Sequence, residues 1–113
     1  MVAAGFVYLF VIQLISENKS KLSELCKAHF VKVLFLFGSA AKGDFEEGTS
    51  DLDFVVEFDP TLAPLDFADN YFSLLDSLKE LFGTEVDLVS YRALKNQVII
   101  NEIESSKIEL YAA

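Results

Sequence analysis

The sequence predicts a small α/β protein of the α+β type, in which a mixed sheet carries helices packed on one face. Apolar runs of strand length occupy 31–37, 52–58 and 85–89. Longer segments with apolar residues at helical spacing alternate with them, most clearly 64–82. The chain has 113 residues, of which 52% are hydrophobic, and this is enough to build one core. We therefore expect a single domain over 1–113.

The chain begins with an apolar run. Val2 to Ile12 is too short to span a membrane and lacks the basic start of a secretory signal. We interpret 1–12 as an apolar N-terminal extension that leads into the first helix and can cover a partner surface. A targeting segment, or a start site placed too far upstream, would produce a similar run, and the sequence leaves these alternatives open.

The first half of the chain then alternates helix and strand. A helix to about His29 is predicted by apolar residues at helical spacing, namely Ile12, Ile15, Leu22, Leu25, Cys26 and Phe30. The predicted strand Val31–Phe37 follows, and Ser39–Lys42 is expected to form a short helical turn. Gly43–Thr49, which holds two glycines and three acids, is predicted as a loop. The next strand, Leu52–Phe58, ends at an Asp-Pro pair.

The second half continues the same alternation. Pro64–Phe82 carries an apolar stripe, and Gly83 stands where a helix commonly ends. The third strand is predicted over Glu85–Val89, and a further helix from Ala93 to about Glu104. The short apolar segment Ile108–Tyr111 is predicted to add an edge strand.

Two motifs at the ends of the predicted strands indicate a site for a metal and a nucleotide. The first strand breaks into a turn at Gly38-Ser39, where backbone N–H groups and a hydroxyl can face an anion. Side chains alternate along a strand, so Asp51 and Asp53 share one face with their carboxylates about 7 Å apart. These carboxylates repel each other unless a cation lies between them. Mg²⁺ suits such oxygen ligands, since it usually takes one or two carboxylates together with phosphate oxygens and water.

A kinase-type phosphate-binding loop is the nearest rival motif, because Gly38 and Gly43 have the spacing of its two glycines. That motif requires Lys and then Ser or Thr after the second glycine. This chain has Asp44-Phe45 there, and the carboxylate would repel phosphate. The sequence therefore argues against it.

In these residues the chain resembles the nucleotidyltransferase superfamily typified by DNA polymerase beta. Within it the chain is similar to the minimal nucleotidyltransferases, small single-domain proteins often paired with a HEPN-domain partner in toxin–antitoxin operons. Their pattern is a Gly-Ser pair, a spacer, Asp-x-Asp on a strand and a third carboxylate on a later strand. Here it reads Gly38-Ser39, an eleven-residue spacer, Asp51-x-Asp53 and Asp87. The resemblance covers roughly 31–91 and implies the polymerase beta-like fold.

The resemblance implies that three acids hold a pair of Mg²⁺ ions and are the catalytic residues. Asp51 and Asp53 would share both ions. Asp87 would complete the site of the ion on the nucleophile side and could accept the proton of the attacking hydroxyl. The two ions in such sites lie about 3.5–4 Å apart.

The resemblance also implies the nucleotide-binding residues. Gly38 would let the backbone approach the phosphates, and Ser39 would bond the beta or gamma phosphate. Lys42 offers a nearby cation, although the family often has Arg at its position.

Composition limits the partners. The chain has 9 basic and 18 acidic residues and a net charge of −9, which argues against direct binding of nucleic acid. A triphosphate can still bind together with its Mg²⁺. The single cysteine, Cys26, excludes an internal disulfide, so we expect a cytoplasmic protein that does not enter a membrane.

We therefore expect an enzyme that transfers AMP from ATP to a hydroxyl. The chain has little room for a substrate-recognition domain, so a partner protein must present the acceptor; the resemblance points to a tyrosine of a HEPN toxin, silenced by the modification. The alternative is a non-catalytic antitoxin that neutralises the toxin by contact alone. Both a homodimer and a hetero-oligomer are compatible with the sequence.

Overall fold

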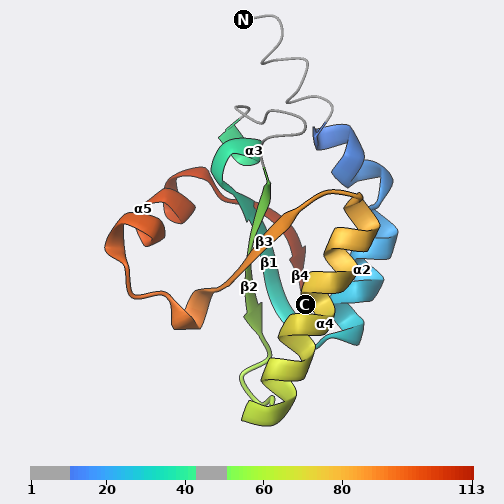
Figure 1. Cartoon of the computed structure of the whole chain (residues 1–113), viewed down its shortest axis with the longest axis vertical. Helices are drawn as coiled ribbons and strands as arrows, with labels where there is room; N and C mark the ends of the chain where they lie inside the picture. Colours follow the sequence, from blue (N-terminus) through green and yellow to red (C-terminus); the bar gives the residue numbers. More distant parts are fainter. Residues whose placement is uncertain (1–10, 43–50) are drawn as a thin grey trace, which may run out of the picture.

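A four-stranded mixed sheet organises the protein (Figure 1). The computed structural model describes residues 11–42 and 51–113. The strands are β1 (Val31–Phe37), β2 (Leu52–Phe58), β3 (Val86–Ser90) and β4 (Ile108–Ala112), and their order across the sheet is β3-β2-β1-β4. β1 runs antiparallel to both β2 and β4, whereas β2 and β3 are parallel. β3 and β4 are therefore the two edges of the sheet.

The helices lie on both sides of this sheet. Residues 11–17 are helical, and the other helices are α2 (Lys19–Ala28), the short α3 (Gly38–Lys42), α4 (Pro64–Phe82), the 3-10 turn η1 (Tyr91–Ala93) and α5 (Gln97–Ser106). Figure 1 shows α2 and α4 side by side, with α5 on the opposite side of the strands. The prediction of helices packed on one face is confirmed for α2 and α4. The prediction is wrong for the last helix, α5, because Ile103 packs on Phe37 and Val55 at the opposite face.

The main core lies between the sheet and the α2–α4 layer. Leu34 and Leu36 of β1 and Phe54 of β2 point into it and are fully buried, because alternate side chains of a strand share one face. The Phe54 ring stacks on Phe82 at 5.7 Å between centroids, so the end of α4 lies against β2. Burial of these large side chains contributes about 1.5–3 kcal/mol each.

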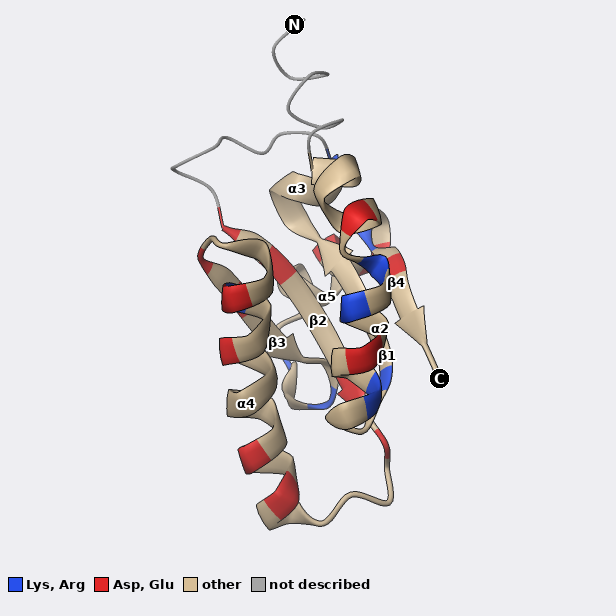
Figure 2. Cartoon of the chain, turned by 90° about the vertical axis from the view of Figure 1, so that its right-hand side faces the viewer, with Lys and Arg blue, Asp and Glu red and all other residues tan. Residues whose placement is uncertain are grey.

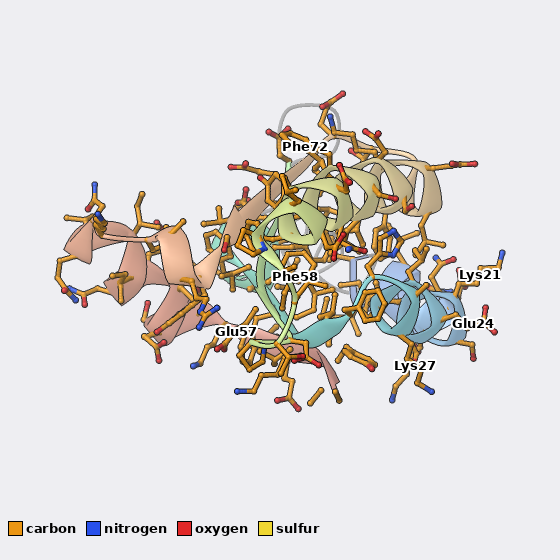
Figure 3. The ribbon with its side chains drawn as sticks, turned by 90° about the horizontal axis from the view of Figure 1, so that it is seen from below. Lys21, Glu24, Lys27, Glu57, Phe58 and Phe72 are labelled. Carbon is orange, nitrogen blue, oxygen red and sulfur yellow. The ribbon has the colours of Figure 1, made fainter. Side chains whose placement is uncertain are left out.

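Phe58 and Glu57, neighbours in β2, show how the sheet separates its two faces. Phe58 packs edge-on against Phe67 of α4 at 5.2 Å, whereas its neighbour Glu57 lies on the other side of the sheet (Figure 3). Phe72 points outward from α4 with 62% of its surface exposed. The strand period predicted for 52–58 is thus confirmed on both faces.

A smaller core on the opposite face holds α5. Ile103 is fully buried against Phe37 and Val55, with Phe35 and Tyr91 at its margin. Ile103 is the one buried residue of α5. A single buried apolar residue gives a weak periodic signal, which explains why the sequence predicted this helix but not the face of the sheet on which it packs.

The element bounds agree closely with the predictions for β1, β2 and α4. β3 lies one residue further along than predicted, and β4 is the expected edge strand. The last helix begins at Gln97 instead of Ala93, because the Asn96 side chain accepts a hydrogen bond from Val98 N–H and starts the helix there.

Some predicted segments fall elsewhere. The loop 43–49 and most of the apolar run at the start lie outside the described residues; of that run, Val11 and Ile12 are seen within a helix. Within 11–42 and 51–113, none of the helices is both long enough and apolar enough to cross a membrane.

We predict that Gly83→Ala destabilises the protein by about 1–2 kcal/mol, because Gly83 ends α4 in the left-handed region at φ 64° and a Cβ is strained there. A Cβ at this position would meet nothing within 4 Å, so the cost comes from the backbone alone. Urea unfolding measures it. Gly83→Asn is the matched control and should cost less, because Asn tolerates this conformation; an Ala variant as stable as the parent would contradict the interpretation.

Candidate active site

Asp53 and Asp87 stand side by side on adjacent strands. The parallel register pairs Asp53 of β2 with Asp87 of β3. Leu52 N–H donates to Glu85 O at 3.1 Å and continues this ladder toward the start of β2. Both carboxylates lie on the face opposite α2 and α4, because Leu52 and Leu88 occupy the core face. The structure thus brings together two of the three predicted acids directly.

Asp51 joins this pair from the residue preceding β2. It is exposed, and it lies two positions before Asp53, on the same side of the strand. Its charge reaches Asp53, since it is one of the groups that raise the pKa of that carboxyl. The three predicted acids are therefore neighbours.

The charge of Asp53 is unfavourable in this setting. Burial has the largest effect and, with Asp87, Asp51 and Glu102, raises the pKa of Asp53 to about 6. Asp53 is half-buried, while Asp51 and Asp87 are exposed. At neutral pH the site thus holds clustered negative charge that a cation would stabilise.

Gly38 lies directly against Asp53. The register pairs Phe37 with Asp53, and Gly38 follows with φ 74°, in the left-handed region. A Cβ on Gly38 would lie 2.5 Å from Asp53 Oδ2, closer than any real contact allows. The family resemblance implied that Gly38 lets the backbone approach the phosphates. The structure gives it another reason, since the missing side chain leaves room for the Asp53 carboxylate.

Ser39 and Lys42 belong to α3, the short helix that begins at Gly38. Ser39 is half-buried. Lys42 is exposed, and its Nζ lies 3.4 Å from Glu102 Oε1 of α5. Both predicted phosphate-binding residues therefore lie on the short helix that starts at Gly38, and Gly38 itself lies against Asp53.

Two residues of α5 reach this site that the sequence did not reveal. Ser106 Oγ accepts a hydrogen bond from Gly38 N–H at 3.2 Å, and Glu102 pairs with Lys42. Their spacing of four residues is a detectable signal, because it places them on the same face of a helix. Nothing in the sequence indicated that this face meets α3.

Tyr71 supports β3 beside the acids. Its hydroxyl donates to the Leu88 carbonyl, which ties α4 to the strand that carries Asp87. Burial first, and then the charge of Asp87, raises the pKa of Tyr71. This tyrosine therefore stays a neutral donor at physiological pH and fixes the edge strand.

The donor chemistry fits a hard divalent cation. Across the described residues, His, Cys, Asp and Glu side chains do not form a ready group of three for a metal ion. Mg²⁺ does not require such a group, because it commonly takes one or two carboxylates and completes its shell with phosphate oxygens and water. Asp53 and Asp87, paired across β2 and β3, would be the two carboxylates available to such an ion.

Comparison with known proteins establishes the family. A family model described as a nucleotidyltransferase domain matches residues 16–110. The chain belongs to the nucleotidyltransferase domain family. Two similar proteins of Methanocaldococcus jannaschii carry the name "Putative protein adenylyltransferase". MJ1379 is 33% identical over 96 residues, which are 85% of this chain and 90% of that protein. MJ0128 is 39% identical over 95 residues, 84% of this chain and 89% of that protein.

Solved structures confirm the nucleotidyltransferase fold. One described as a "putative minimal nucleotidyltransferase" is 29% identical, with a TM-score of 0.63 over 85% of this chain and 92% of that chain. A chain of a toxin–antitoxin complex with AMP-PNP has a TM-score of 0.65 at 23% identity, over 85% of this chain and 74% of that chain. A chain from a complex of a tri-AMPylated HEPN toxin of Shewanella oneidensis with an MNT antitoxin has a TM-score of 0.60 at 21% identity. The match covers 88% of this chain and 73% of that chain.

We predict that, without metal, Asp53→Asn is more stable than the parent at pH 7.5 by about 1–3 kcal/mol. The pKa of Asp53 is about 6 in the folded protein, above the value of about 3.9 expected when unfolded. The favourable contribution of the protonated Asp53 carboxyl to the free energy of unfolding is therefore fully present below pH about 4. It is lost as the pH rises through about 6 and the carboxyl ionises. Thermal unfolding from pH 4 to 8 in chelator should show the two proteins converging at low pH. Asp76→Asn, an exposed change on α4, is the charge-matched control; a constant difference across the range would contradict the prediction.

We predict that Gly38→Ala costs more stability than Gly83→Ala, because the added methyl meets Asp53 Oδ2 as well as a left-handed backbone. An overpacked contact of this kind adds about 1–3 kcal/mol. The double variant Gly38→Ala with Asp53→Ala removes the carboxylate and should lose this excess in a double-mutant cycle of urea unfolding. Additive costs would show that the contact is not the cause.

Proposed function

We propose that this nucleotidyltransferase transfers AMP from ATP, with Mg²⁺, to a hydroxyl of a partner protein. The observation that carries the proposal is the pairing of Asp53 with Asp87 beside the Gly38 turn, in a chain of this family. The names of the Methanocaldococcus jannaschii relatives support a protein as the acceptor of AMP.

The acids would hold the cation. In this proposal Asp51, Asp53 and Asp87 hold Mg²⁺, as a pair of ions in the two-metal scheme. When bound, Mg²⁺ neutralises the charge of the triphosphate and lowers the pKa of the attacking hydroxyl. The half-buried Asp53 is held in place by strands on both sides, which gives the site a rigid centre.

The other side chains have distinct tasks. Asp87 is exposed on the edge strand β3, where it can accept the proton of an incoming hydroxyl. The Ser39 hydroxyl and the Lys42 ammonium face the terminal phosphates, as hydrogen-bond donor and charge. Holding these groups on one strand and one short helix keeps the reacting atoms in line, which is the main requirement of this chemistry.

The acceptor must come from outside the described fold. The acids lie beside an edge strand, so a second protein can approach Asp87 without displacing a strand. We propose a tyrosine of a HEPN toxin as the acceptor, with this chain as its antitoxin in a cytoplasmic hetero-oligomer. The known complex of a tri-AMPylated HEPN toxin with an MNT antitoxin supports this partner.

Charge supports a basic partner. The net charge is −9, and Figure 2 shows acidic positions spaced along α4, which are Asp66, Asp69, Asp76 and Glu80. Such a surface attracts a basic protein and speeds its association. A toxin that cleaves RNA would carry basic charge of this kind.

A non-catalytic antitoxin is the second candidate, and one observation favours it. Gly38 N–H and Lys42 both have partners in α5, as they would in a site that takes no nucleotide. Against it stands the acid cluster, since a binding module gains nothing from like charges that raise the pKa of Asp53. We therefore favour the enzyme.

We predict that the toxin encoded beside this chain gains the mass of one or more AMP units when incubated with the chain, ATP and Mg²⁺. Asp53→Asn and Asp87→Asn should each lower the rate at least about 100-fold, because each removes a charge that holds the cation. Intact-mass spectrometry gives the result, and Glu24→Gln, which removes an exposed charge from α2, should retain the activity. A partner that is bound and inhibited yet unmodified would establish the non-catalytic antitoxin.

The same proposal predicts that ATP binds tightly with Mg²⁺ or Mn²⁺ and weakly in chelator, because the acids repel a bare triphosphate. Calorimetry compares the two conditions directly. Equal affinity in both would refute the metal requirement.

A further inference from the structure

The last two turns of α5 hold groups of the proposed phosphate site. Glu102 Oε1 lies 3.4 Å from Lys42 Nζ, and Ser106 Oγ accepts from Gly38 N–H at 3.2 Å. The Ser106 hydroxyl in turn donates to the Glu102 carbonyl at 2.7 Å. Glu102 and Ser106 are one turn apart, so one face of α5 meets both ends of α3.

This contact is set by packing. Ile103, next to Glu102, is fully buried against Phe37 and Val55, so α5 is fixed to the sheet at this turn. Glu102 itself stays on the surface: its side chain and that of Lys42 are each 44% exposed. The helix is therefore fixed, while the Glu102 carboxylate can move away from Lys42 without disturbing the core.

The Glu102–Lys42 pair is easily exchanged. An exposed ion pair at 3.4 Å is weak, because water screens both charges. A phosphate group carries more charge and more acceptor oxygens than a carboxylate, so it competes well for an ammonium. Glu102 also lies close enough to the acids for its charge to act on Asp53, so it belongs to the same site as Asp53 and Lys42.

We propose that Glu102 is a positioning residue that takes the place of the nucleotide's terminal phosphates when the site is without nucleotide. It holds Lys42 beside the Gly38 turn before ATP binds, releases Lys42 to the phosphates, and takes it back as pyrophosphate leaves. This inference rests on the proposed function and adds to it a residue that tunes affinity for the phosphate chain.

Two consequences follow for binding. Each phosphate ligand must break the Glu102–Lys42 contact and approach a further negative charge, so Glu102 weakens binding of ATP and of pyrophosphate alike. Removing that charge while keeping the shape of the side chain should strengthen both. A purely structural role predicts a different result, namely lower stability with no gain in affinity.

The test is calorimetric titration of Mg²⁺-pyrophosphate and Mg²⁺-ATP into the parent, Glu102→Gln, Lys42→Ala and the double variant. We expect Glu102→Gln to bind pyrophosphate about 3- to 10-fold more tightly, corresponding to the energy of one exposed ion pair. Lys42→Ala should weaken binding, and the gain from Glu102→Gln should shrink in the double variant, because the two residues act through one contact. Unchanged or weaker binding by Glu102→Gln would overturn the proposal.

The control is Glu24→Gln, which removes one exposed charge from α2. Glu24 lies between Lys21 and Lys27, on the side of the molecule away from α5 (Figure 3). It should leave pyrophosphate affinity unchanged; an equal gain in this control would reduce the effect to net charge and overturn the role of Glu102. A parent protein that transfers AMP while Glu102→Gln shows no gain refutes this inference alone. A parent protein that neither binds Mg²⁺-ATP nor transfers AMP refutes the proposed function as well.

Discussion

The register of β2 between its two neighbours is the constraint on which the rest of the site depends. It sets Asp53 beside Phe37 on one side and beside Asp87 on the other. A shift of one residue would move Asp53 to the core face and expose Phe54, together with every other core side chain of β2. The hydrophobic core therefore fixes the site, because the same alternation that buries Leu52 and Phe54 presents the carboxylates.

The sequence revealed those parts of the structure that leave a periodic or local signal. Strand alternation predicted the face shared by Asp51 and Asp53, and Gly83 predicted the end of α4. The neighbourhood of Asp87 and Asp53 came only with the family resemblance, since no local pattern says which strands pair. The contacts of Glu102 and Ser106 with α3 were missed because α5 buries a single residue, Ile103, and the position of α5 depends on contacts distant in the chain.

The site is a place where stability and function oppose each other. Clustering acids near a half-buried Asp53 raises its pKa and disfavours the folded state at neutral pH. The surroundings offset this cost with buried side chains on both faces of β2, including Phe54 on one face and Val55 on the other. The left-handed Gly38, pressed against the same carboxylate, is a second local compromise at the same point.

The place of β3 at the edge of the sheet has an evolutionary consequence. Asp87 stands on the outermost strand, so under the proposed function this chain would form one side of the reaction site and a docked protein the other. Surface residues along that border can then change to suit a new partner while the strands that hold the acids remain as they are. A small domain of this kind can keep the strands that carry its acids and still acquire a new partner through substitutions at the surrounding surface.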